Sequence, residues 1–376
     1  MRDVTGIIMI KLSNTKVLKL IEKILRRYEP IACRTYMVAA AIGGTDRNYY
    51  KVNLKGWNAM NNNTCQICSN MTKPFYECVY DDRYGYPKTY SLLKCDSCGH
   101  AAVSPELTSN EISTLYTEYY PRKEMPDEMN TKAIIASKGK IFLEGKGTSC
   151  HYSVPSKSRC LDIGCGFGES LFYLKHIQCE AYGVEADENV LKMAEKYDLN
   201  IKIGLFDPTG YKKDFFDYIT MSQVLEHMVN PVETIKGVHG ILKPNGHLVF
   251  SVPNSQSIMA KFIKRKWINW HIPYHQQHFT KDSIIMLAQE CGFEVESIKI
   301  ITPTPWLIYQ INHLLSYPKK GKASVFWSYS YKKILYLQII FGITGLIDRL
   351  NLMMPIARFL DLFKIGESYV VTFRRL

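Results

Sequence analysis

Apolar and polar residues follow two patterns along this chain, one typical of strands and one typical of helices. From residue 158 onward, segments with the two patterns alternate. Short apolar runs bounded by polar or glycine-containing turns predict β-strands; they fall at residues 159–163, 180–185, 201–203, 216–222, 247–252, 293–301 and 368–374. Apolar residues at helical spacing predict helices between them, over 169–176, 188–197, 231–242 and 281–291. Such alternation is typical of a parallel sheet with helices on both faces. We therefore predict an α/β fold with seven strands in this part of the chain.

The ends of two of these elements carry local signals. Thr280 is expected to cap the helix that runs to Cys291, and Gly292 to end it. Residues 243–246 are expected to form a turn in which Gly246 takes a positive φ. Upstream, a helix is predicted over 109–120, capped by Ser109 or Asn110, and another over 131–143.

The remaining segments divide the chain into smaller units. Residues 11–27 have a helical pattern, but no clear period follows. Codons for residues 55–57 can spell a ribosome-binding site ahead of Met60, so a start at Met60 is an alternative. We divide the chain into an uncertain N-terminal extension (1–59), a cysteine-containing module (60–108), a helical connector (109–157), the α/β domain (158–302) and a helical insertion with the last strand (303–376).

Composition limits the partners and the compartment. The chain has 376 residues, 46% of them apolar, and a formal charge of +12, which favours anionic partners such as nucleic acid, acidic lipid or a phosphorylated substrate. A merely solvated basic surface stays an open alternative. Eleven scattered cysteines and no secretory leader indicate a reducing cytoplasm. The longest apolar run, 334–347, is shorter than the roughly 20 residues of a bilayer span, so we predict no transmembrane helix.

The first strand runs into a glycine-rich turn. Asp162 precedes Gly164, Gly166 and Gly168, whereas a dinucleotide fingerprint would need its third glycine where Glu169 stands. Glycines let the backbone bend sharply and approach a ligand closely, and an acid at the end of a strand suits a ligand with a positive amino group. The pattern D-x-G-x-G-x-G resembles motif I of the class I S-adenosylmethionine-dependent methyltransferases.

Other segments extend this resemblance over about residues 158–300. They are V-L-E-H at 224–227, L-K-P-N-G at 242–246 and S-V-P-N at 251–254. The resemblance implies a Rossmann-like, seven-stranded methyltransferase sheet with S-adenosylmethionine as the cofactor. Glu185, which ends the second strand, would accept hydrogen bonds from both ribose hydroxyls. The other cofactor-binding residues that the resemblance implies are Phe206, Asp207, Ser222 and Gln223; Asp207 departs from the family pattern, because Leu205 directly follows the glycine.

Two C-x-x-C pairs precede the α/β domain. Cys65 with Cys68 and Cys95 with Cys98 have the spacing of a tetrahedral zinc site, in preference to redox or chance pairing. Zinc would be structural in a segment too small for its own core, or the segment would bind nucleic acid. The phrase from the first pair to Tyr119-Tyr120 resembles the zinc-ribbon front end of methyltransferases acting on sugars and polysaccharide precursors, which is thought to cover the active site.

Two segments supply candidate catalytic groups. His227 can take a proton near neutral pH, and Glu226 would orient it; the resemblance associates this pair with sugar methylation, although a partly structural role stays open. The loop 270–280 holds histidines and aromatics suited to a polar ring, and His278 matches a recurrent H-F-T. We expect no metal at this loop, because no carboxylate lies within it.

These observations favour methyl transfer to a sugar or glycan precursor, nucleotide- or lipid-linked. We prefer O- over C-methylation, because the 75 residues after Ile301 are too few and too apolar for the further region of sugar C-methyltransferases. The acceptor is expected to be phosphorylated. Lys261, Lys264, Arg265 and Lys266 would hold a diphosphate or an anionic membrane surface, or form a solvated face. Alternatives are an RNA methyltransferase, disfavoured because no N-P-P-Y-type loop follows strand four, and a non-catalytic binding protein. Residues 305–363 contact the inner membrane face, form a dimer face or, by default, cover the sheet.

Overall fold

The structure is a computed structural model that describes residues 64–121 and 127–376. The expected extension 1–59 and the alternative start at Met60 lie outside the described residues. The described residues belong to one unit of the chain, to which all of the following refers.

The main sheet has seven strands, as the sequence predicts. Its central strands run parallel, and β11 lies antiparallel between β8 and β10. In spatial order the strands are β10 (Phe293–Ile301), β11 (Ser368–Arg375), β8 (Leu242–Pro253), β7 (Phe216–Ser222), β4 (Arg159–Ile163), β5 (Glu180–Glu185) and β6 (Ile201–Ile203). Six of the seven predicted strands agree with these bounds to within a residue, and the α/β prediction is confirmed.

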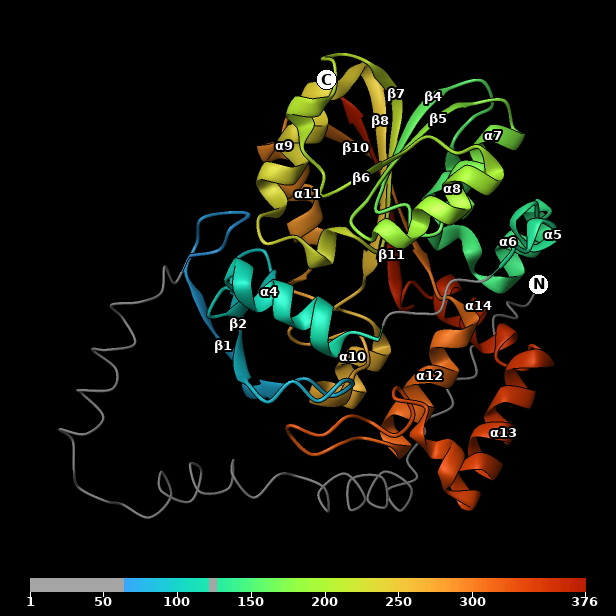
Figure 1. The fold of residues 1–376 in the computed structure, drawn as a ribbon. Helices are drawn as coiled ribbons and strands as arrows, with labels where there is room; N and C mark the ends of the chain where they lie inside the picture. The colour runs from blue at the N-terminus through green and yellow to red at the C-terminus, as the bar shows by residue number, and fades with distance from the viewer. Residues whose placement is uncertain (1–63, 122–126) are drawn as a thin grey trace, which may run out of the picture. The chain divides into compact units, whose positions relative to one another are not determined.

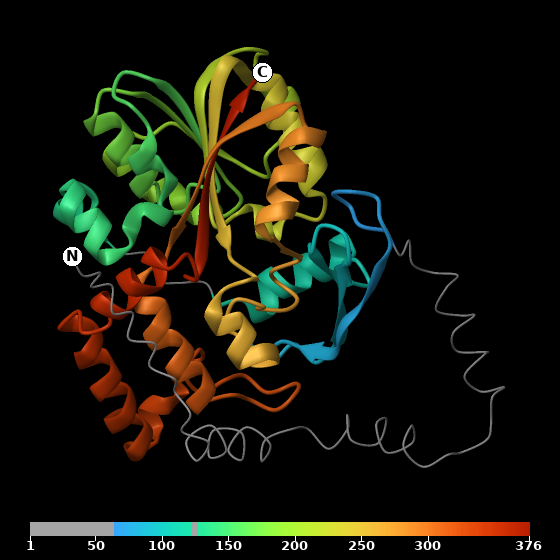
Figure 2. The ribbon, with the colours of Figure 1, turned by 180° about the vertical axis from the view of Figure 1, so that it is seen from behind.

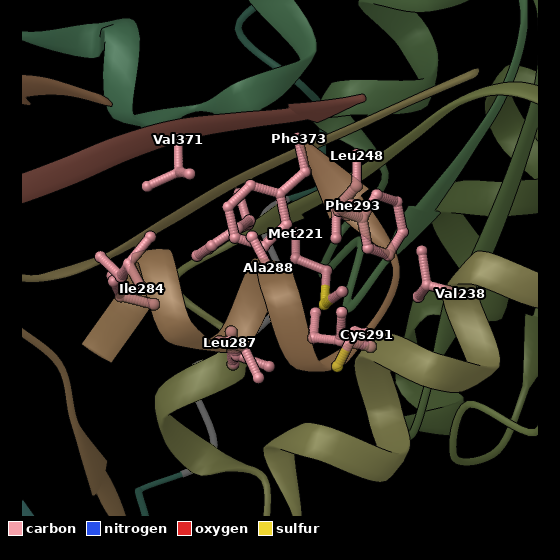
Figure 3. Close-up of a cluster of buried hydrophobic side chains, with 14 of the residues drawn as sticks. Met221, Val238, Leu248, Ile284, Leu287, Ala288, Cys291, Phe293, Val371 and Phe373 are labelled. Carbon is pink, nitrogen blue, oxygen red and sulfur yellow. The ribbon is translucent and has the colours of Figure 1, made fainter. Parts of the chain in front are cut away.

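Helices cover both faces of this sheet (Figures 1 and 2). One face carries α9 (Pro231–Ile241) and α11 (Lys281–Glu290), and the other carries α7 (Glu169–His176) and α8 (Leu191–Tyr197). Thr280 caps α11 as predicted, accepting a hydrogen bond from the Ser283 amide. Figure 3 shows how Ile284, Leu287 and Ala288 of α11 pack toward Phe293 and Phe373 of the sheet. These buried apolar contacts hold the sheet whose strand ends build the site.

Three local predictions are wrong in detail. The predicted turn 243–246 lies inside β8, and Asn245 rather than Gly246 takes the positive φ, at 61°. The predicted helix 131–143 is two helices, α5 (Thr131–Ile134) and α6 (Lys138–Glu144), because Ser137 caps a new start. The helix α4 (Ser109–Thr114) is capped by Thr108, not by Ser109 or Asn110, and continues as a π-turn over Leu115–Tyr119.

A second sheet joins the cysteine module to the α/β domain. Its order is β1 (Thr72–Tyr80), β2 (Thr89–Cys95), β3 (Ala101–Ser104) and β9 (Gln277–His278). The last strand comes from the segment that follows β8 and α10 (Ile258–Ile263). Tyr90 and Leu92 of the module share one apolar cluster with Trp267 and Tyr274. The module therefore has no separate core among the described residues.

Three helices precede the last strand: α12 (Thr304–Leu315), α13 (Leu335–Arg349) and α14 (Met354–Leu362). They lie together beyond one end of the main sheet (Figure 1). In the described part of the chain, no single helix is long and apolar enough to cross a bilayer. Taken together, α13 and α14 meet the requirements of length and composition, but the pair is bent by 65°.

Candidate active site and cysteine cluster

The glycine-rich turn after β4 has the conformation that its residues predict. Gly164, Gly166 and Gly168 have φ values of 71°, 52° and 85°, a region that other residues rarely occupy. A Cβ on Gly164 would lie 2.7 Å from Val224, whereas a Cβ on Gly166 would meet no atom within 4 Å. The middle of the turn therefore faces open space, into which a ligand can approach the backbone.

Glu185 links the end of β5 to this turn. Its Oε2 accepts a hydrogen bond from the Gly166 amide at 2.9 Å, and its Oε1 accepts from the amides of Ala186 and Asp187. The two motifs that the sequence places 19 positions apart are thus in direct contact. A carboxylate held beside a glycine turn at the ends of parallel strands is arranged as a ribose-binding group would be.

Asp162 is turned toward the protein interior. It is 3% exposed, and its carboxylate accepts hydrogen bonds from the hydroxyls of Ser170 and Thr220. Burial raises its pKa to about 6, against the lowering effect of these two hydroxyls. The expected contact with a cofactor amino group stays a prediction. In the structure, Asp162 links the glycine turn to α7 and β7 through its hydrogen bonds with Ser170 and Thr220.

The expected adenine-binding residues are engaged locally. Phe206 packs against the main core and stacks on Tyr211, and Asp207 caps the 3-10 turn Pro208–Gly210 through the Thr209 amide. Between Gly204 and these residues, Leu205 is 82% exposed. The Gly204 amide donates a hydrogen bond to the Glu185 carbonyl, which places Leu205 beside the end of β5. From the sequence, Leu205 was only a departure from the family pattern and was not identified as an exposed apolar side chain at this site.

Ser222 and Gln223 belong to a hydrogen-bond network at the end of β7. The Ser222 hydroxyl accepts from the Cys150 amide at 2.9 Å, and the Gln223 side chain donates to the Ser251 hydroxyl at 3.1 Å. Gln223 has a φ of 58°, a left-handed conformation that turns the chain sharply out of the strand. The next residues, up to His227, form the 3-10 turn that carries the candidate base.

His227 lies within reach of a tyrosine from the module side. Its Nδ1 is 3.1 Å from the Tyr116 hydroxyl and 3.0 Å from the Tyr274 carbonyl oxygen. Because a carbonyl only accepts, Nδ1 carries the proton and Nε2 the lone pair. Burial lowers the pKa of His227 to about 4, so its ring is neutral at pH 7. The expected orienting bond from Glu226 is absent, and the Tyr274 carbonyl holds the ring in its place.

Glu226 is the most isolated acid of the site. It has 0% exposure, and neither carboxylate oxygen has a hydrogen-bond partner. Burial raises its pKa to about 8, against a smaller lowering effect of its own backbone amide.

The structure brings His275, and not His278, to this acid. One ligand atom each of Glu226, His227 and His275 lies within 4.8 Å of the others. His278 is buried in β9, where its Nε2 donates to the Trp270 carbonyl at 3.1 Å and burial lowers its pKa to about 4. Its assignment to the catalytic set is therefore not supported by its position. The sequence signal for His275 was its place in the P-Y-H segment, within the histidine-rich loop ahead of β9.

The four cysteines of the C-x-x-C pairs converge. The Sγ atoms of Cys68 and Cys95 are 3.4 Å apart, those of Cys68 and Cys98 3.5 Å, and those of Cys65 and Cys98 3.6 Å. Around a tetrahedral Zn²⁺ with Zn–S near 2.3 Å, sulfurs lie about 3.8 Å apart. His100 Nδ1, at 3.8 Å from the Cys65 sulfur, offers an N–H donor to a thiolate. The donor set and its spacing fit a structural zinc ion.

Comparison with known proteins gives consistent matches over the α/β domain. Residues 145–298 match the family described as "Methyltransferase domain". The chain is 23% identical over 162 residues to the ubiquinone biosynthesis O-methyltransferase of Ruegeria pomeroyi, covering 39% of this chain and 65% of that protein. It is 30% identical over 119 residues to the putative methyltransferase YqeM of Bacillus subtilis, covering 29% of this chain and 48% of that one. The chain thus spans less than two thirds of these relatives.

Comparison with solved structures gives one further likeness. The S-adenosylmethionine-dependent methyltransferase of Mesorhizobium loti aligns with 62% of this chain and 98% of its own, at 18% identity and a TM-score of 0.39.

Proposed function

We propose that this chain, whose residues 145–298 match a methyltransferase-domain family, uses S-adenosylmethionine to transfer a methyl group to a hydroxyl of a sugar or glycan precursor. The observation that carries the proposal is one edge of the sheet, where the glycine turn, Glu185 and the Glu226–His227 segment meet. Gly166 is bonded to Glu185, and Val224 packs against Gly164 two residues ahead of Glu226. A cofactor held by the first two would present its methyl group near the third.

In the proposed reaction the acceptor hydroxyl gives its proton to the lone pair on Nε2 of His227, and its oxygen attacks the cofactor methyl carbon. A carbon–oxygen bond forms while the carbon–sulfur bond breaks, and its electron pair returns to sulfur as S-adenosylhomocysteine leaves. The protein binds both partners, aligns oxygen, carbon and sulfur, and excludes water. The low pKa of His227 makes it a weak proton acceptor on its own.

A cluster of tyrosines supports a sugar acceptor. Tyr84, Tyr116 and Tyr120 surround Tyr274 with ring centroids 5.4–5.6 Å away, and Tyr116 also reaches His227. Aromatic faces with hydroxyl rims suit a polar ring, which needs both stacking and hydrogen bonds. The O-methyltransferase relatives are consistent with oxygen as the methylated atom.

We also propose that Cys65, Cys68, Cys95 and Cys98 hold one structural Zn²⁺. Bound there, zinc would fix the turn beside β3, to which β9 and the loop with His275 are paired. Its role in the reaction is then to keep that loop in place.

A peripheral membrane location fits the last helices. On α13, Leu335, Ile339, Ile343 and Leu346 form an exposed stripe at spacings of three or four residues. A similar exposed stripe on and around α14 comprises Leu352, Ile356, Phe359 and Phe363, and exposed lysines precede α13 at Lys319, Lys320, Lys322 and Lys332. Apolar stripes beside cationic side chains match an anionic lipid surface, where a lipid-linked acceptor would be found.

Calorimetric titration with S-adenosylmethionine tests the proposed function first. We expect saturable binding, and transfer of labelled methyl groups to nucleotide- or lipid-linked sugars. An absence of binding would leave only a scaffold role, and transfer to RNA instead of sugars would favour the nucleic-acid alternative.

Sedimentation with vesicles tests the location separately. We expect the protein to pellet with phosphatidylglycerol vesicles, less so in high salt, and I343D to remain in the supernatant while the control L191D on α8 pellets. A wild type that stays in solution would refute the membrane location. A dimer that I343D dissociates would identify a second copy as the partner.

A further inference from the structure

We propose that Glu226, His227 and His275 bind a divalent metal ion, which contacts the acceptor oxygen. The proposal rests on the proposed function only for what the ion does, since the binding site itself is defined by these three side chains.

The first support is their convergence from two segments. One ligand atom of each residue lies within 4.8 Å of the others, and three ligands on one ion with bonds near 2.0–2.2 Å lie about 3–4 Å apart. Binding would therefore draw the three atoms together by up to about 1–2 Å. The rings of His227 and His275 are perpendicular, with centroids 4.7 Å apart, so the two imidazoles do not stack on each other.

Backbone and amide contacts fix this convergence. The Gln276 amide donates to the Glu226 carbonyl at 2.8 Å, and its side chain donates to the His227 carbonyl at 3.2 Å. The Gln277 side chain donates to the Val229 carbonyl at 3.0 Å. The loop with His275 is thus bonded along the turn that carries the other two ligands.

Both histidines have the tautomer that a metal ligand needs. The Nδ1 of His227 lies 3.0 Å from the Tyr274 carbonyl, and the Nδ1 of His275 lies 2.9 Å from the Asn269 carbonyl. Carbonyls force the proton onto Nδ1 and leave a lone pair on Nε2. Ligating histidines in proteins are held in this way by an outer acceptor.

The unpartnered carboxylate is the independent observation. Both oxygens of Glu226 are buried without a hydrogen bond, and an isolated buried carboxylate is costly. Arg83 is a cation of this neighbourhood, but its guanidinium donates to the Ile268 carbonyl and lies over the Trp327 ring. A divalent ion would satisfy the carboxylate and both imidazoles together.

Two imidazoles and one carboxylate suit Mn²⁺, Fe²⁺ or Zn²⁺ and leave coordination positions open for acceptor oxygens. An ion there would polarise the acceptor hydroxyl and ease loss of its proton. Since Nε2 of His227 would then be bound to the ion, the released proton would pass to water.

Manganese binding tests the proposal without any assay of turnover. Protein with zinc in its cysteine cluster is titrated with Mn²⁺, and the free-ion signal is followed by electron paramagnetic resonance. Mn²⁺ prefers oxygen and nitrogen ligands, so the thiolates do not compete. We expect one bound Mn²⁺ per chain, at least tenfold weaker binding in E226Q and H275Q, and unchanged binding in the control H239Q on α9.

Thermal unfolding and S-adenosylmethionine calorimetry establish that each variant is folded and separate this proposal from the proposed function. Should a variant not fold, nitrogen modulation in the pulsed spectrum of the wild-type complex reports imidazole ligation directly. Mn²⁺ left free by the wild type, bound Mn²⁺ without nitrogen modulation, or full-affinity binding by folded H275Q would each overturn the metal site.

Discussion

Replacing Asp162 by asparagine should stabilise the protein relative to wild type, and by more as the pH rises, although the change removes a charge from the glycine-turn motif. The asparagine oxygen can accept from Thr220, and its amide can donate to the Ser170 hydroxyl, so both contacts of the buried carboxylate survive. The substitution therefore isolates the cost of ionising this side chain inside the protein.

The structure sets the size of that cost. Burial raises the pKa of Asp162 to about 6, against about 3.9 in an unfolded chain. The folded state therefore holds the proton more tightly, and this stabilisation is complete below pH ~4 and lost as the pH rises through about 6. At about 1.4 kcal/mol per pKa unit, the loss is about 3 kcal/mol at neutral pH. For a unit of some 300 residues this corresponds to roughly 4–5 °C in Tm.

Scanning calorimetry of wild type and D162N between pH 4.5 and 8 measures this difference. Titrations that both proteins share, including those of the cysteines, cancel in the comparison. We expect the Tm of D162N minus that of wild type to rise with pH. D207N is the control with no pH dependence in this range, because hydrogen bonds from Thr209 lower the pKa of exposed Asp207 from 3.8, so that Asp207 is ionised in both the folded and the unfolded chain above pH ~5. A pH-independent difference for D162N would refute the reasoning, since Asp162 would then be ionised at no cost.

Three further outcomes follow from the same site. E185A should weaken S-adenosylmethionine binding about 10–100-fold by calorimetry, because hydrogen bonds to a charged group are worth about 1.5–3 kcal/mol; unchanged affinity would remove Glu185 from the cofactor site. C95S should reduce zinc, measured by atomic absorption, from one per chain to well below one, and full retention would refute the four-cysteine site. G164A should lower the Tm, because its Cβ would lie 2.7 Å from Val224 at a positive φ; V224A should restore part of the loss, and additive effects of the two changes would exclude this contact.

The sheet could be predicted from the sequence because its signals are local. Buried parallel strands are short apolar runs, and the turns between them carry their own glycine or capping residues. The strand 216–222, for example, matches β7 without error. The glycine turn and Glu185 follow in register for the same reason.

The candidate metal site could not be predicted, because its ligands come from separate segments. The loop 270–280 contains no acid, so the sequence predicts no metal there. Glu226 belongs to another segment, and the hydrogen bonds of Gln276 bring His275 close to it. β9 could not be predicted either, because a strand of two residues shows no hydrophobic period and its pairing with β3 is a tertiary contact. The H-F-T motif favours His278 over His275, but in the structure the His278 ring is hydrogen-bonded to the Trp270 backbone carbonyl.

The short strand β9 gives the cysteine cluster a consequence beyond its own stability. On one side, β9 pairs with β3, and the Thr280 hydroxyl donates to the Cys98 carbonyl at 2.6 Å. On the other, Gln276 donates to the Glu226 carbonyl and its own carbonyl accepts from the Val103 amide. A loosened cysteine turn would therefore release the same backbone that holds His275 against Glu226. A zinc ion here, although it touches no substrate, would set the geometry of the groups that do.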